Sequence, residues 1–210
     1  VSVDQANQYL QLIKNEFAQF YAEEKSVLLS LSLENDKYGR PNKSYIQGFG
    51  PCSPTNLRYL YQALLILEYI ASEDIKEVDI IEIGGGYGGL SLFLHHLCDF
   101  HVETKIKSYT IFDIPEICEL QRRYLNIHDI ELADQTAIKK NSFLISNYGF
   151  SELPLDIRQD YTNRVIQPYT SHGFLAWNHS DLYEFVEGKE ISSEVERPLT
   201  GSTNLFVRYK

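Results

Sequence analysis

The chain has 210 residues, of which 43% are hydrophobic, and a formal net charge of −10 at pH 7. This hydrophobic share excludes a disordered chain, and the length suits one α/β domain with an extension. The negative charge disfavours nucleic acid and anionic membranes as partners, and no apolar run approaches the roughly 20 residues that span a bilayer.

The three cysteines, Cys52, Cys98 and Cys118, form no CxxC pair and no Cys/His spacing that is typical of a metal site. An odd number of cysteines favours thiols in a reducing compartment over a disulfide framework. The first residues also lack the basic and apolar regions of a signal peptide. We therefore expect a cytoplasmic protein without a metal site.

The N-terminal region is predicted to be helical. Apolar residues recur at helical spacing, at Leu10, Ile13, Phe17, Phe20 and Tyr21. Further helices are predicted over residues 26–33 and 57–71, the latter capped by Ser53 or Thr55. Residues 34–42 are rich in turn formers, and the loop 38–53 is a candidate lid over a ligand. We expect residues 1–74 to form a helical extension that carries this lid.

From residue 75 onward, strands alternate with helices. Strands are predicted at 78–83, 108–112, 142–146 and 173–177, with a weaker one at 129–133, and helices at 90–97 and from Pro115 onward. This alternation indicates a parallel sheet that helices cover on both faces. Two final strands, 191–197 and 204–209, have no helix between them, so we expect an antiparallel hairpin to end the domain 75–210.

A glycine-rich turn follows the first of these strands, in Glu82-Ile83-Gly84-Gly85-Gly86-Tyr87-Gly88-Gly89. Glycines permit a sharp turn and let a ligand approach the backbone, and the N-terminus of the next helix offers N–H groups to it. Gly84, Gly86 and Gly89 fit the GxGxxG of dinucleotide sites. Glu82, Gly84, Gly86 and Gly88 also fit a second pattern, (D/E)xGxGxG.

Asp113 ends the second strand, directly before Ile114 and Pro115. A carboxylate at this place can accept hydrogen bonds from both hydroxyls of a ribose. It can alternatively cap the helix that Pro115 opens, in which case the same oxygens would be shared. The glycine turn upstream favours ribose binding.

These motifs resemble the class I S-adenosyl-L-methionine-dependent methyltransferases, over residues 78–210. The resemblance rests on residues 82–88, on Phe112-Asp113-Ile114-Pro115 and on residues 143–148. The run over residues 145–153 resembles the sugar O-methyltransferase family. The resemblance implies an α/β, Rossmann-like sheet of seven strands, the last one antiparallel, with helices on both faces and an N-terminal helical extension.

The resemblance also implies a place for each part of the cofactor, S-adenosyl-L-methionine. The methionine end would lie against Glu82, Gly84, Gly86, Tyr87 and Gly88. The ribose would lie at Asp113 beside Ile114, the adenine at Asp134 and Gln135, and the sulfonium near Asn147 and Tyr148. The third strand is short and polar, which departs from the pattern at the adenine.

Methyl transfer requires an aligned acceptor and, for a hydroxyl, a group that takes its proton. The ionisable residues expected at the carboxyl ends of the strands are Glu152 and His179. Each also has a structural interpretation, Glu152 as an acid in the first turn of a helix and His179 as a loop histidine. We predict O-methylation of a small polar acceptor, with a sugar or glycoconjugate favoured.

For partners, we expect a small-molecule or glycan acceptor, no nucleic acid and no membrane, and we allow for a homodimer. Two alternatives stay open at this stage. One is an NAD(P)-dependent oxidoreductase that uses the same glycines. The other is a non-catalytic cofactor-binding subunit, because the sequence does not decide which residue is the base.

Overall fold

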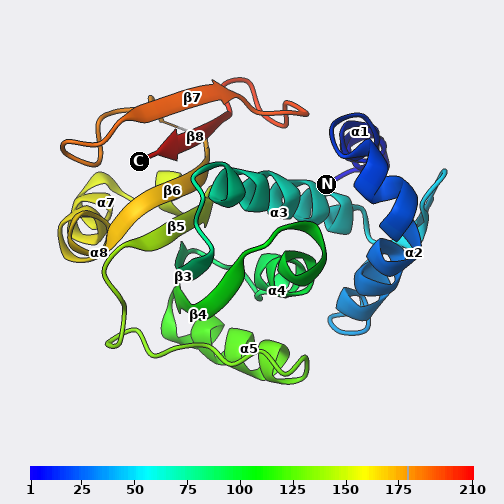
Figure 1. Ribbon diagram of the computed structural model, residues 1–210, viewed down its shortest axis with the longest axis horizontal. Helices are drawn as coiled ribbons and strands as arrows, with labels where there is room; N and C mark the ends of the chain where they lie inside the picture. The colour runs from blue at the N-terminus through cyan, green and yellow to red at the C-terminus, as the bar shows by residue number, and fades with distance from the viewer. Residues whose placement is uncertain (179) are drawn as a thin grey trace. The chain divides into compact units, whose positions relative to one another are not determined.

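A computed structural model describes residues 1–178 and 180–210 of the chain (Figure 1). The chain packs as two compact units. The first contains Val1–Ile75 and Gly89–Thr104, and the second contains Lys76–Gly88 and Lys105–Lys210. The glycine turn therefore belongs to the second unit, and the helix that follows it in the chain belongs to the first.

The first unit consists mainly of helices, namely α1 (Val3–Glu16), α2 (Ala18–Asn35), α3 (Pro54–Ser72) and α4 (Gly89–His101). Helix α1 starts with a capping box between Ser2 and Gln5. The apolar spacing predicted that the first helix continues to Tyr21, but the backbone breaks at the buried Phe17 (φ −123°, ψ 40°). Helix α3 begins one residue after Ser53, whose side chain makes no capping bond.

A short hairpin lies where the sequence predicted a loop. It is formed by β1 (Ser44–Ile46) and β2 (Gly50–Cys52), which pair antiparallel. The Tyr21 hydroxyl donates to the carbonyl of Gly48 at 2.8 Å, and the amide of Ser53 donates to Asp36 Oδ2 at 2.7 Å. These two bonds anchor the hairpin to helix α2 within the first unit.

The second unit is built on a mixed sheet, in which the described residues form six strands in the order β4-β3-β5-β6-β8-β7 (Figure 1). The strands β4, β3, β5 and β6 are parallel, and β8 runs antiparallel to both β6 and β7. Their bounds are β3 (Glu77–Ile83), β4 (Lys105–Phe112), β5 (Ser142–Asn147), β6 (Thr170–Trp177), β7 (Ile191–Val195) and β8 (Leu205–Tyr209).

The prediction of a strand over residues 129–133 was wrong. Asp129 adopts a left-handed conformation (φ 57°), and among the described residues a single backbone bond joins the segment to the sheet, from the amide of Ala133 to the carbonyl of Tyr109 at 2.8 Å. A polar segment with few β-branched residues gains little from a place in a buried sheet. Strand β4 is therefore an edge strand, and the part of the chain that the structure describes forms six strands where the resemblance implied seven.

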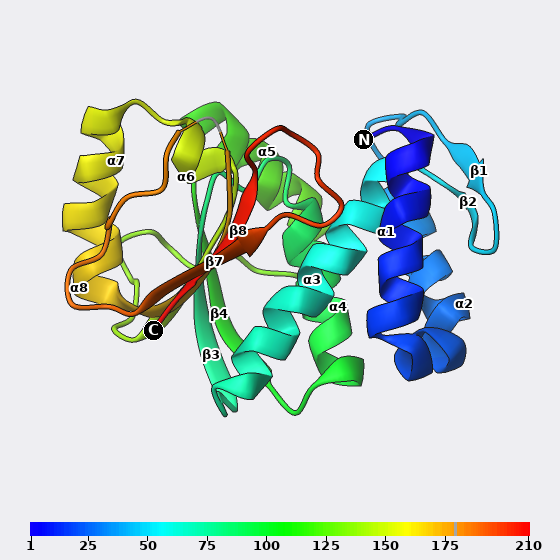
Figure 2. The same cartoon turned by 90° about the horizontal axis from the view of Figure 1, so that it is seen from above.

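Helices and aromatic packing complete the second unit. The helices are α5 (Pro115–Asn126), α6 (Gly149–Glu152), α7 (Leu155–Tyr161), the π-helical segment η1 (Thr162–Ile166) and α8 (Gln167–Tyr169). Helices α7 and α8 lie together beside the sheet in both views (Figures 1 and 2). The buried core centres on Trp177, whose ring lies 5.9 Å from that of Phe150 and 5.4 Å from that of Phe185.

The pairing of Gly173 with Tyr209 across β6 and β8 generates a stability prediction. A Cβ on Gly173 would lie 2.3 Å from Cε1 of Tyr209, which is itself buried. We expect Gly173→Ala to lower the free energy of unfolding by about 1–3 kcal/mol, the usual cost of overpacking. Urea denaturation of Gly173→Ala and of the double variant with Tyr209→Leu measures this, since the smaller side chain should reduce the cost of the added methyl. Equal stability of Gly173→Ala and the parent chain would contradict the packing described.

Candidate functional site

The turn after β3 is locked to the turn after β5 by two glycines. A Cβ on Gly84 would lie 2.8 Å from the Cα of Gly149, and a Cβ on Gly149 would lie 2.8 Å from the carbonyl oxygen of Ile83. The Ser146 hydroxyl donates to the same carbonyl at 2.7 Å and accepts from the amide of Phe150 at 2.8 Å. The carboxyl ends of these neighbouring strands therefore form one rigid edge, which is where open α/β sheets bind ligands.

Gly86 lies at the tip of this turn. Its φ is +56°, a conformation that side-chain-bearing residues rarely adopt, and a Cβ there would meet no protein atom within 4 Å. Its carbonyl accepts a hydrogen bond from Nε2 of Gln121 at 2.7 Å. The tip is thus exposed on one side and held by helix α5 on the other.

The Glu82 carboxyl is buried under the turn. It is 1% exposed, its Oε2 accepts the hydroxyl of Tyr109 at 2.8 Å, and a Cβ on Gly85 would lie 3.1 Å from that same oxygen. Burial raises the pKa of Glu82 to about 7, the Tyr109 bond opposes this shift, and the charge of Asp113 adds to it. The acid of the motif is therefore hydrogen-bonded to a buried tyrosine, Tyr109, for which the sequence predicted no role in the site.

Asp113 lies at the end of β4, where the sequence placed a ribose ligand. Its Oδ1 accepts the amide of Ile114 at 2.9 Å, and its Oδ2 accepts Nε2 of Gln121 at 3.1 Å. Helix α5 starts at Pro115 without a side-chain cap. The alternative role of Asp113 as the cap of this helix is therefore not observed, and its carboxylate faces the turn.

The expected adenine residues follow the irregular segment beside β4. Asp134 is exposed, and its Oδ1 accepts both the amide and the hydroxyl of Thr136 at 2.7 Å, bonds that lower the pKa of Asp134. The amide nitrogen of Gln135 donates to the carbonyl of Ile111 at 2.7 Å. The structure therefore brings the Gln135 side chain to the C-terminal part of β4, two residues before Asp113, while Asp134 bonds within its own turn.

Tyr148 follows β5 in a left-handed conformation (φ 68°), with its amide bonded to the carbonyl of Ala176 at 2.8 Å. Its hydroxyl donates to Glu196, a carboxylate that is 1% exposed just beyond β7. Glu196 Oε2 also accepts the Thr200 amide at 2.9 Å and Nδ2 of Asn204 at 3.0 Å. Sequence reasoning missed this buried carboxylate, since no local pattern links it to Tyr148.

Of the two residues predicted as the base, Glu152 and His179, the structure describes Glu152. The exposed Glu152 lies at the end of α6, where its Oε1 accepts Nδ2 of Asn178 at 2.7 Å. Asn178 in turn accepts the Ser151 hydroxyl at 2.6 Å. Glu152 therefore stands at the carboxyl end of β6 beside the residues that follow β5. His179 lies outside the described residues.

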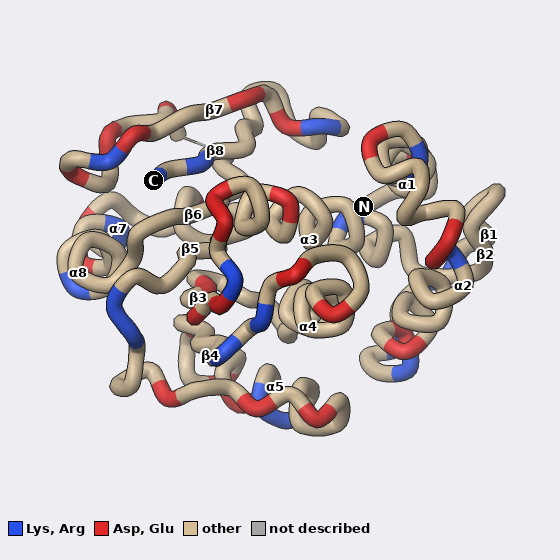
Figure 3. Tube along the Cα trace, viewed as in Figure 1, with Lys and Arg blue, Asp and Glu red and all other residues tan. Residues whose placement is uncertain are grey.

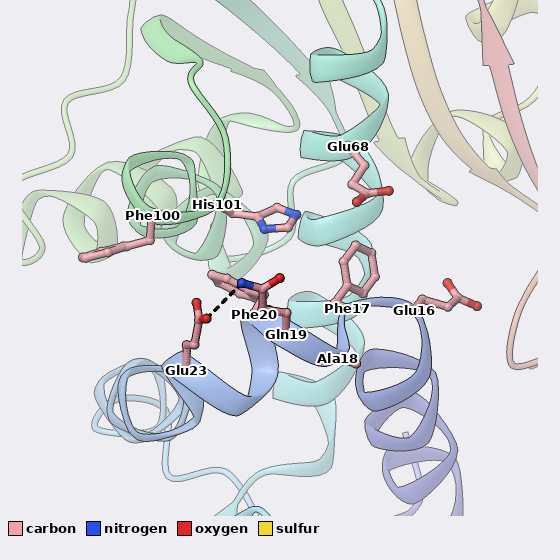
Figure 4. Close-up of a pocket in the computed structure, with 9 residues that line it drawn as sticks. All are labelled: Glu16, Phe17, Ala18, Gln19, Phe20, Glu23, Glu68, Phe100 and His101. Atoms are coloured by element: carbon pink, nitrogen blue, oxygen red, sulfur yellow. Dashed lines mark hydrogen bonds between the residues drawn. The ribbon is translucent and has the colours of Figure 1, made fainter.

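A separate hollow of about 380 Å³ lies in the first unit (Figure 4). Phe17, Phe20 and His101 pack together in it, with the ring of His101 4.6 Å from that of Phe20, and burial lowers the pKa of His101. The carboxylates of Glu16 and Glu68 lie at its margin. None of the residues that the sequence predicted for the cofactor lines this hollow.

The distribution of charged and metal-binding side chains does not indicate a second site among the described residues. Acidic and basic positions are interspersed along the described trace (Figure 3). Within the described residues, no three His, Cys, Asp or Glu side chains are grouped so that they could hold a metal ion. None of the helices in that part of the chain is both long and apolar enough to cross a membrane.

Comparisons with solved structures identify the fold. A magnesium protoporphyrin IX methyltransferase (ChlM) from Synechocystis PCC 6803 with bound S-adenosylhomocysteine is 10% identical, with a TM-score of 0.51 over 93% of this chain and 98% of that chain. The CMeT domain of the citrinin polyketide synthase is 14% identical, with a TM-score of 0.50 over 75% of this chain and 53% of that chain. A SAM-dependent methyltransferase from Aquifex aeolicus is 15% identical, with a TM-score of 0.44 over 70% of this chain and 90% of that chain.

No protein-family model matches the sequence, and neither does any curated protein. The likeness therefore shows the fold alone. The chain has an α/β fold with a mixed sheet, and this fold is that of the class I S-adenosyl-L-methionine-dependent methyltransferases.

The buried carboxyl of Glu82 predicts a pH dependence of stability. Its pKa is about 7 in the folded chain, against the value of 4.5 taken for an unperturbed glutamate in the unfolded chain. Unfolding at a pH between these two values therefore releases a proton. Stability must then fall as pH rises through this window, on the order of 3 kcal/mol in all, since one pKa unit corresponds to about 1.4 kcal/mol. We expect Glu82→Gln to lack most of this fall between about pH 5 and about pH 8.

Urea denaturation at several pH values measures the effect, with Glu77→Gln as the matched control. Glu77 begins the same strand but is exposed, with Oε1 3.3 Å from Nζ of Lys107. The control should keep the pH dependence of the parent chain. If Glu82→Gln keeps it too, another group is responsible.

Proposed function

We propose that this chain binds S-adenosyl-L-methionine and transfers its methyl group to a hydroxyl of a small polar acceptor, with a sugar or glycoconjugate favoured. One observation carries the proposal. Within a class I methyltransferase fold, the turn at Gly86 and the carboxylate of Asp113 lie at the ends of adjacent strands and are joined by Gln121. The neighbour from Synechocystis is a methyltransferase with bound S-adenosylhomocysteine.

The residues present fit this cofactor. A Cβ at Gly86 would meet no atom of the described residues within 4 Å, so the backbone there is open to close approach by a ligand. Among the described residues, each oxygen of Asp113 accepts one protein hydrogen bond, and a carboxylate has about four lone-pair sites, so two hydroxyls can still be accepted. Ile114 is 60% exposed beside it and offers an apolar surface.

We assign the parts of the cofactor accordingly. The turn Gly84–Gly88 would hold the methionine end, with Glu82 supporting it from below. Asp113 would hold the ribose, and Gln135 together with Ile114 would lie near the adenine. Asn147 and Tyr148 would lie near the transferred group. Asp134 would act near the adenine indirectly, by its hydrogen bonds to Thr136 in the turn beside Gln135.

When bound, the cofactor supplies a methyl group that is already activated on a sulfonium. The work left to the protein is to align the acceptor, exclude water and accept the proton of a hydroxyl. Glu152, oriented by Asn178 at 2.7 Å, is the candidate for that proton among the described residues. His179 remains the second candidate from the sequence.

A polar acceptor is supported by the groups that follow β5 and β6. Asn147, Tyr148 and Asn178 bring amide and hydroxyl groups to one edge of the sheet, where the buried Ser151 hydroxyl bonds to Asn178. Amide and hydroxyl groups recognise a polyol by hydrogen bonding. The net charge of −10 disfavours a nucleic acid acceptor. The proposal also places the protein in the cytoplasm, in keeping with its cysteine usage.

A matched pair of glycine variants tests cofactor binding. Gly86 and Gly188 both have positive φ values, +56° and +67°, and a Cβ on either would meet no protein atom within 4 Å. Alanine at either place should lower stability by a similar amount, about 1 kcal/mol, because both conformations are strained for an L-residue. Only Gly86→Ala should weaken binding of S-adenosylhomocysteine, by roughly tenfold or more, because the added methyl group would occupy the space in which the ligand approaches the backbone.

Isothermal titration calorimetry with S-adenosylhomocysteine and with NADH makes this measurement on the parent chain and both variants. Binding of NADH in place of S-adenosylhomocysteine would support the oxidoreductase alternative instead. Equal weakening by both alanine variants would place the ligand away from the turn.

Methyl transfer itself is tested with radiolabelled S-adenosyl-L-methionine and a panel of free sugars and glycosides. We expect label in an ether-linked methyl group that is stable to mild base, and a fall of roughly 100-fold or more in rate for Glu152→Gln, the usual contribution of a general base. The control Glu131→Gln alters an exposed carboxylate elsewhere and should leave the rate unchanged. Binding of S-adenosylhomocysteine without transfer to any acceptor would favour the non-catalytic alternative.

A further inference from the structure

Gln121 is a buried polar side chain that joins the two loops of the proposed site. It lies on α5 with 0% exposure. Its Nε2 donates to the carbonyl of Gly86 at 2.7 Å and to Oδ2 of Asp113 at 3.1 Å. An amide NH₂ carries two hydrogens, so it can serve both acceptors at once. One side chain therefore sets the separation between the tip of the glycine turn and the carboxylate at the end of β4.

The chemistry of this bridge restricts the residue that can form it. The carbonyl of Gly86 and the carboxylate of Asp113 are both acceptors, so the group between them must be a donor with two hydrogens. A lysine would neutralise Asp113 by an ion pair, whereas the uncharged amide leaves the carboxylate as an anionic acceptor. Hydrogen bonds from hydroxyls to an ionised carboxylate are stronger than those to neutral groups.

The orientation of the amide is fixed by the same contacts. Rotation of the amide by half a turn would place Oε1 against two acceptors, the Gly86 carbonyl and Asp113 Oδ2. In the observed orientation, Oε1 is buried and has no hydrogen-bond partner among the described residues. A buried acceptor left in this state is unfavourable for stability, so packing of α5 alone would be served better by an apolar side chain of similar length. The two hydrogen bonds that the amide donates, both to groups of the proposed site, explain why a glutamine occupies this buried position.

We propose that Gln121 is a positioning residue that gives the site its preference for a ribose with free hydroxyls, by holding Asp113 in register with the glycine turn. This inference rests on the proposed function, because it takes the ligand of Asp113 to be the cofactor ribose. Gln121 acts through Asp113 and Gly86 and need not touch the ligand itself. Without the bridge, the bond from the amide of Ile114 is the one that remains to the Asp113 carboxylate among the described residues.

The experiment compares two ligands, S-adenosylhomocysteine and its 2′,3′-dideoxy analogue, by isothermal titration calorimetry. The parent chain should prefer the ligand with hydroxyls. Gln121→Met, which keeps the length but removes the donor, should weaken S-adenosylhomocysteine by roughly tenfold and the analogue much less, so that the preference shrinks by a similar factor. Its thermal stability should change little, because the loss of the two donated bonds and the removal of the unpaired Oε1 act in opposite directions.

Two further variants complete the design. Gln121→Glu keeps the shape of the side chain and serves if Gln121→Met fails to fold; it places an acceptor against two acceptors and should reduce the ribose preference in the same way. Gln167→Met is the matched control, because the Gln167 amide also joins two segments, through the carbonyl and the amide of Glu187 at 3.2 Å and 3.0 Å. It should leave both affinities unchanged.

The outcomes separate the inference from the function on which it rests. If the parent chain binds neither ligand, the proposed function falls and the inference falls with it. If the parent chain prefers S-adenosylhomocysteine and both Gln121 variants keep that preference, cofactor binding stands and the positioning role is overturned. Loss of the preference in the Gln121 variants, with the control unchanged, supports the role.

Discussion

The second unit depends on the contact between the backbones of Gly84 and Gly149. Neither residue has space for a Cβ, so the turns after β3 and β5 meet at a distance that only two glycines permit. Ser146 completes the joint by bonding to the carbonyl of Ile83 and the amide of Phe150. The parallel strands bring their carboxyl ends to this one edge of the sheet. The glycine turn, Asp113 and Tyr148 follow β3, β4 and β5 and therefore lie at the same edge.

Two carboxylates on neighbouring strands show how environment divides their roles. Glu82 is enclosed, and its pKa is raised to about 7 by burial, whereas Asp113 lies half-buried with a donor on each oxygen. The first supports the turn from below, and the second is directed towards a ligand. Because the charge of Asp113 also raises the pKa of Glu82, a ligand that shields Asp113 will ease ionisation of Glu82. The two acids are therefore coupled through the turn that lies between them.

The sequence predicted the features that arise from local periodicity and missed those that arise from distant contacts. The strand before the glycine turn and the helix that opens at Pro115 were found because alternation, β-branched residues and a proline are local signals. Strand β4 begins at Lys105, three residues before the expected start, because Lys105 and Ile106 continue the pairing with β3 at the sheet edge. Gln121 and Glu196 were missed, since they reach partners 35 and 48 residues away and carry no local motif.

The segment that replaces the third strand has a consequence for how molecules of this protein meet. An edge strand presents a row of unpaired N–H and C=O groups, which is a template for a strand of another molecule. Here the carbonyls of Tyr109 and Ile111 are occupied by the amide of Ala133 and the side chain of Gln135. Residues 129–135 thus cover part of the β4 edge, which makes pairing of that edge with a strand of another molecule less favourable.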